Sequence, residues 1–202
     1  MYKLTIRETA FIDHYLENSG VEYLDIRMEM ADHVATAIEV MEGDDFDENF
    51  RLYMLAHKAE LLANYKQFKK AATYKALKIW GKTALTPWAL LMTNVIAYAG
   101  FYFGTIEGVE EITWKMNLVF LVAFFSVSLP ILINGFKKKY AVASRLITLA
   151  AIPYIISNIG MRIFTDNLLF ISLFYSVITM ISITMTVAGF RLIKQYKLRY
   201  DG

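Results

Sequence analysis

The 202-residue sequence contains no cysteine, only three prolines and only three histidines. Without cysteine the chain cannot form disulfides, use a thiolate nucleophile or bind a metal through sulfur, and its redox compartment is left open. It also lacks a glycine-rich phosphate loop, a nucleophile elbow, a zinc-protease motif and a dinucleotide fingerprint. We therefore expect no enzyme activity and no cofactor.

Charge is scarce over long stretches of the second half. Hydrophobic residues make up 56% of the chain and the mean hydropathy is +0.38, above the roughly 45–50% apolar content of soluble chains. Four stretches carry no charged residue: 83–106, 116–136, 146–161 and 167–190. About twenty helical residues cross a hydrocarbon core roughly 30 Å thick. We therefore predict four membrane spans at about 83–106, 116–136, 145–163 and 167–192, of which the third is the shortest.

The connecting loops predict the orientation of these spans. Lysine and arginine are concentrated before the first span, between the second and third, and in the tail at 193–202, whereas the loop after the first span holds three glutamates and Lys115. Because basic loops remain in the cytoplasm, we expect both termini there, in a plasma (bacterial inner) membrane. No secretory signal is evident, since charge interrupts the first apolar residues.

The prolines fall within or at the start of the spans. Pro87 is expected in the first turn of its helix, where a missing N–H costs little. Pro130 and Pro153 lie deeper and should bend or break their helices. Such breaks line binding sites in some transporters, but kinks absorbed by helix packing are commoner.

The first half of the chain is strongly charged, and its acidic and basic residues lie in separate segments. Residues 1–50 hold thirteen acidic residues against three basic ones, whereas residues 51–82 hold one acid against eight bases. This asymmetry favours a membrane surface or a charged partner, and the acidic part would repel nucleic acid.

Three helices are expected in this half. Thr5 and Glu8 form a capping box, and Gly20 is placed to end the first helix. The second runs from about Glu22 to Met41, with apolar and acidic stripes, and Gly43 closes it. Asp45 to Glu48 offer a second capping box, and the third helix continues towards the membrane with increasing lysine content. Its apolar face is formed by Phe50, Met54, Leu61, Tyr65 and Phe68.

The expected fold is therefore all-α. A small three-helix cytoplasmic domain (residues 1–70, the head) and a basic juxtamembrane segment (71–82) precede a four-helix transmembrane bundle (83–192). The run FIDHYLENSGVEYLDIRMEMADHVATAIEVMEGDDFDENF resembles the helical heads of HAAS-type and permease-prefix-like bacterial membrane proteins. Many of those heads are associated with PadR-like transcription regulators, so the resemblance implies a regulatory or interaction role. It carries over no catalytic residue.

The acidic stripe of the second helix is the candidate site for a cytoplasmic protein partner or a second copy of the chain. It consists of Glu22, Asp25, Glu29, Asp32 and Glu39. The predicted function is thus regulatory, signalling or scaffolding. The alternative is a small channel or transporter, or an accessory subunit of one. The spans contain hydroxyls and amides but no Asp, Glu, Lys or His, which weighs against ion-coupled transport.

Two further groups of residues could bind ligands. Glu29, Asp32 and His33 share a helix face and are weak metal candidates, which His14 and His57 could join if the helices converge. The alternative is that His33 and His57 are partly buried structural residues. Lysines beside the membrane could contact anionic lipid, or simply set the topology. These are Lys66, Lys69, Lys70, Lys75, Lys78, Lys82, Lys137, Lys138 and Lys139.

Overall fold

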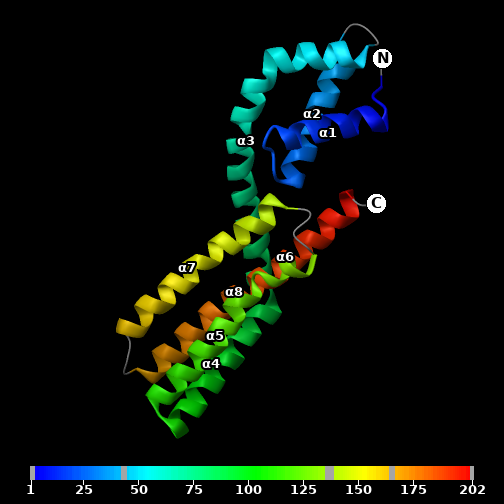
Figure 1. Cartoon of the computed structure of the whole chain (residues 1–202). Coiled ribbons are helices and arrows are strands. Elements are labelled where there is room, and N and C mark those ends of the chain that lie inside the picture. The colour runs from blue at the N-terminus through cyan, green and yellow to red at the C-terminus, as the bar shows by residue number, and fades with distance from the viewer. Residues whose placement is uncertain (1–2, 42–44, 135–138, 164–166, 201–202) are drawn as a thin grey trace. The chain divides into compact units, whose positions relative to one another are not determined.

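The computed structural model describes residues 3–41, 45–134, 139–163 and 167–200, and every regular element in these ranges is a helix. The all-α prediction is therefore confirmed. The helices are α1 (Ile6–Asn18), α2 (Leu24–Glu39), α3 (Phe46–Ala84), α4 (Pro87–Glu107), α5 (Val109–Ser126), α6 (Leu129–Asn134), α7 (Ala141–Ile163) and α8 (Leu168–Tyr200) (Figure 1). They form two compact units. The first comprises Met1–Thr73 with Lys137–Ala141, and the second comprises Tyr74–Phe136 with Val142–Gly202.

Helix α1 begins and ends as its sequence predicts. The Thr5 hydroxyl accepts from the Glu8 backbone N–H, and the Glu8 carboxylate accepts from the Thr5 N–H, so the capping box is complete. Gly20 follows the helix with φ +93°, a left-handed conformation that glycine adopts without a steric penalty. Local sequence therefore sets both ends of α1.

The first unit has a small apolar core. Helix α1 buries Ile12 and Leu16, and α2 buries the stripe from Ile26 to Ile38. From α3, Phe50, Met54 and Leu61 are buried as predicted, whereas Tyr65 and Phe68 are only half-buried. Phe11 is 48% exposed, although its ring makes T-shaped contacts with the rings of Phe46 and Phe50. Burial of the apolar face of α3 therefore decreases along the helix from Phe50 to Phe68.

Helix α3 is one continuous helix of 39 residues. The Asp45 carboxylate accepts from the backbone N–H groups of Asp47 and Glu48, so the Asp45 half of the predicted capping box is present at its start. The helix runs through the lysine-rich segment 71–82 and ends at Ala84. Pro87 then stands in the first turn of α4, as predicted. Gly43, predicted to close α2, lies outside the described residues.

In the second unit, α8 is the common packing partner of α4 and α5, and the three helices lie side by side in Figure 1. A buried cluster joins Ile112, Met116 and Phe120 of α5 to Ile171, Tyr175 and Ile178 of α8. Close contact with α4 depends on small residues. At Gly104 of α4 an added Cβ would collide with the Leu168 side chain of α8.

Within the described ranges, three helices are long and apolar enough to cross a membrane: Pro87–Glu107, Ala141–Ile159 and Leu168–Tyr196. They coincide with the first, third and fourth predicted spans. The second predicted span is divided between α5 and α6, which are separated by a turn at Val127 and Ser128 just before Pro130. Pro130 therefore breaks its helix as predicted. Pro153 lies inside α7, which continues through it.

Candidate interaction site

The acidic stripe of α2 is divided between structural and exposed residues. Glu22, Glu29 and Asp32 are exposed, Glu39 is half-exposed, and Asp25 is only 7% exposed. A carboxylate this deeply buried needs hydrogen-bond donors to offset its lost hydration. Asp25 therefore differs in role from its neighbours.

Asp25 caps another helix. Its Oδ1 accepts a hydrogen bond of 2.8 Å from the backbone N–H of Ala141, the first residue of α7. Ala141 is 1% exposed. A helix begins with backbone N–H groups that have no partner within the helix, and a negative charge there is favourable. Within the first unit, a residue 116 positions earlier in the chain thus supplies the acceptor for the first residue of α7.

Two further bonds hold the same segment. The Leu24 backbone N–H donates to the Lys139 carbonyl at 2.8 Å. The Lys139 ammonium lies 3.4 Å from the Glu22 carboxylate. That pair is exposed and contributes little by itself. We call these three contacts, made by residues 22, 24 and 25 with residues 139–141, the loop clasp.

The remaining acidic side chains present negative charge to solvent. Glu39 accepts a hydrogen bond from the Leu4 backbone N–H, which joins the N-terminal segment to the end of α2. In the described part of the chain, no ion pair is found for Glu29 or Asp32. These two carboxylates are the part of the predicted partner site that remains available.

No sequence pattern indicates the charged contact between α1 and α2. Arg27 of α2 donates to Asp13 and Glu17 of α1, each at 2.7 Å. Burial of its guanidinium lowers the pKa of Arg27, but hydrogen bonds and attraction to Asp13 and Glu17 outweigh it and leave the pKa raised. The spacing of 14 positions between Arg27 and Asp13 crosses a turn, so helical periodicity could not reveal it.

No group of three or more His, Asp or Glu side chains in the described ranges could hold a metal ion. Within their own helices, His14 lies near Glu17 and His57 near Glu60. The alternative interpretation of His33 and His57 as partly buried residues is wrong, because both are exposed.

The predicted lipid-contact lysines have different surroundings. Lys66, Lys70, Lys78 and Lys82 are exposed. Lys69 lies over the rings of Tyr23 and Tyr65, and Lys75 over that of Tyr196. Lys139 belongs to the loop clasp, and Lys137 and Lys138 lie outside the described residues.

In the second unit, buried hydroxyls of α8 bond mainly to their own helix. Ser172, Ser176 and Ser182 each donate to a backbone carbonyl three or four residues earlier. Thr184 does the same and also accepts from the indole N–H of Trp80 at 3.1 Å. Of these four hydroxyls, that of Thr184 therefore links α8 to α3.

Comparison of the chain with protein-family models, with curated proteins and with solved structures found no match.

Proposed function

We propose that this chain is a multi-span membrane protein whose helical head is a regulatory interaction domain. The loop clasp is the observation that carries the proposal. Through it, α2 supplies hydrogen bonds to the segment that leads into α7, one of the helices able to cross a membrane. A partner that displaces α2 would remove the cap of α7. Conversely, a conformational change at the start of α7 would alter the hydrogen bonds made by Leu24 and Asp25 of α2.

Membrane insertion is supported by the exposed side chains of the second unit. Helix α4 exposes large apolar side chains around most of its surface, and α7 exposes Ile152, Ile155, Ile156 and Ile159. Soluble proteins rarely expose contiguous apolar areas of this kind, because water contact with them is costly. A hydrocarbon surrounding removes that cost.

We further propose four spans, the second being the broken α5–α6 segment, with both termini in the cytoplasm. Loop charge supports this orientation. The absence of cysteine from the sequence allows a direct test, because a single introduced cysteine is the only thiol. We expect a membrane-impermeant maleimide to label Glu110→Cys in intact cells, and Lys58→Cys or Lys194→Cys only after permeabilisation. The reverse pattern would overturn the orientation.

The proposed partner surface is centred on Glu29 and Asp32. Two exposed carboxylates one helical turn apart suit a basic surface of a cytoplasmic protein or of a second copy of the chain. The resemblance of the head to HAAS-type domains, whose relatives accompany transcription regulators, agrees with this role.

A photocrosslinking amino acid at position 32 of the full chain, in its native membrane, tests this surface. We expect a discrete product there that disappears when Glu29→Lys is added, and none at position 58 of α3, which is also exposed. A product of twice the chain mass would identify a second copy as the partner. Equal yields at positions 32 and 58 would contradict the proposal.

The channel or transporter alternative has weaker support. The buried hydroxyls of α8 that could line a path are bonded to their own backbone. The loop clasp, by contrast, has no role in a passive pore. We therefore favour regulation.

A further inference from the structure

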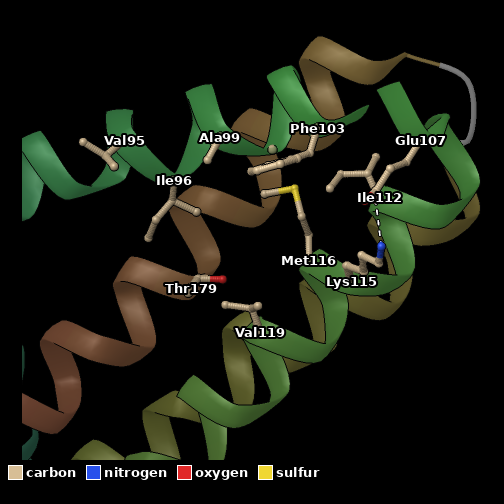
Figure 2. Close-up of a pocket in the computed structure, with 11 residues that line it drawn as sticks. Val95, Ile96, Ala99, Phe103, Glu107, Ile112, Lys115, Met116, Val119 and Thr179 are labelled. Atoms are coloured by element: carbon tan, nitrogen blue, oxygen red, sulfur yellow. Dashed lines mark hydrogen bonds and ion pairs between the residues drawn. The ribbon is translucent and has the colours of Figure 1, made fainter. Parts of the chain in front are cut away.

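The second unit contains an apolar groove between α4 and α5, and Thr179 of α8 also lines it. Its volume is about 430 Å³. Val95, Ala99 and Phe103 of α4 face Met116 and Val119 of α5 across it (Figure 2). One end is polar, because Glu107 and Lys115 line it and form an ion pair.

The length of the groove matches one leaflet of a bilayer. Val95 and Glu107 lie twelve residues apart on the same helix, which corresponds to about 18 Å at 1.5 Å per residue. Half of a hydrocarbon core is roughly 15 Å thick. The groove therefore extends from the helix ends, where headgroups would lie, to about the middle of the membrane.

The charges at the polar end select among headgroups. The Lys115 ammonium lies 2.9 Å from the Glu107 carboxylate and 3.4 Å from that of Glu111. One ammonium therefore stands against two carboxylates at this end of the groove. An anionic headgroup would meet net repulsion, whereas a zwitterionic one can offer its phosphate to Lys115 and its cation to a carboxylate.

We propose that this groove binds one acyl chain of an amine-headed zwitterionic phospholipid, phosphatidylethanolamine. Its phosphate lies at Lys115 and its primary ammonium donates to Glu107. A primary ammonium donates hydrogen bonds that the quaternary ammonium of phosphatidylcholine cannot. The site rests on the proposed membrane insertion but is independent of the partner of the head.

Photolabelling of the full chain tests the site. The protein is reconstituted into vesicles of equal parts phosphatidylethanolamine, phosphatidylcholine and phosphatidylglycerol. Each preparation contains a trace of one of these lipids with a photoreactive group in its acyl chain. We expect the ethanolamine probe to label the peptides around Ala99 and Val119 roughly two- to fivefold more than the choline probe, as an exposed charge contact allows.

Matched variants distinguish recognition of the headgroup from binding of the acyl chain. Glu107→Gln should abolish the preference for ethanolamine, whereas Glu110→Gln, an equal change of charge that spares the ion pair, should keep it. Ala99→Trp should reduce labelling of the groove by all three probes, and Ala151→Trp on the exposed face of α7 should not.

Other outcomes overturn the inference in distinguishable ways. Strongest labelling by phosphatidylglycerol would refute the headgroup assignment. Labelling of the groove no greater than that of the exposed Val122 would show that the groove holds no particular lipid. Crosslinks between two chains through Val119 would assign the groove to a second copy. Absence of label from all apolar helices would refute membrane insertion itself, and with it the lipid site.

Discussion

Removal of the Asp25 carboxylate should release the start of α7. In Asp25→Ala the backbone N–H of Ala141 loses its acceptor while the residue remains 1% exposed. A buried donor without a partner costs more than the mean value of a hydrogen bond, because its hydration is not restored. The change is therefore expected to act at Ala141 and at the α2 residues that share the loop clasp.

The magnitude follows from two overlapping estimates of the same event. Loss of a helix N-cap costs about 0.5–2 kcal/mol, and an unsatisfied buried amide costs about 1–3 kcal/mol. We take about 1–3 kcal/mol, which corresponds to a roughly 5- to 150-fold increase in the local opening constant. Asp25→Asn keeps an oxygen acceptor and loses only the charge, so its cost should be about 0.3–1 kcal/mol.

Hydrogen exchange of the full chain in nanodiscs measures these costs directly, because amide protection reports the free energy of local opening. Peptides covering residues 139–145 and 22–28 should exchange faster in the order Asp25→Ala, then Asp25→Asn, then the native chain. Glu29→Ala serves as the matched control, since Glu29 is an exposed acid on the same helix. Its exchange should equal that of the native chain.

Two results would refute the reasoning. Unchanged exchange at residues 139–145 in Asp25→Ala would mean that the hydrogen bond from Ala141 does not hold this segment. Equal acceleration by Asp25→Ala and Glu29→Ala would mean that the effect comes from the total charge of α2 and not from the cap.

Three further predictions concern packing and charge. Arg27→Ala should destabilise the α1–α2 pair by about 1–3 kcal/mol, measured by hydrogen exchange in α1. Because the pKa of Arg27 is raised above its ordinary value, the guanidinium stays charged as pH rises, and loss of this contact should not lower the stability of the native chain between about pH 7 and pH 10. Phe120→Ala, at a fully buried site, should lower the free energy of unfolding by about 3–5 kcal/mol, measured by reversible unfolding in detergent. Val122→Ala should lower it far less, because Val122 is 67% exposed. Gly189→Ala should cost about 1–3 kcal/mol in the same assay, since its Cβ would lie 2.9 Å from the rigid ring of Pro130; a native-like unfolding midpoint would contradict this contact.

Local sequence predicts the helix ends better than it predicts their contacts. The Thr5–Glu8 capping box and the caps at Asp45 and Pro87 appear where their patterns indicate. Each depends on residues within four positions, so the chain near the cap contains all the necessary information. The start of α2 is less exact, at Leu24 instead of Glu22, because Tyr23 supplies no side-chain cap.

The second predicted span shows the limit of counting charges. Residues 116–136 are free of charge, yet α5 begins at Val109 and carries Glu110, Glu111 and Lys115 in its first turns. A helix start favours acidic residues, so those glutamates indicate where α5 begins and not where it stops. The absence of charge correctly locates an apolar segment but does not predict where its helices end. The division into α5 and α6 is set by Pro130 and the turn before it.

The acidic stripe of α2 shows why function is harder to predict than fold. By spacing alone, Asp25, Glu29 and Asp32 are equivalent, since all three lie at three-or-four-residue intervals on one helix. They differ in burial, because Asp25 is buried and accepts a hydrogen bond from the backbone N–H of Ala141, whereas Glu29 and Asp32 are exposed. A contact over 116 positions leaves no periodic trace in a single sequence. The stripe is therefore one structural residue followed by a charged surface, and a variant that neutralises all of it would confuse loss of the loop clasp with loss of a partner.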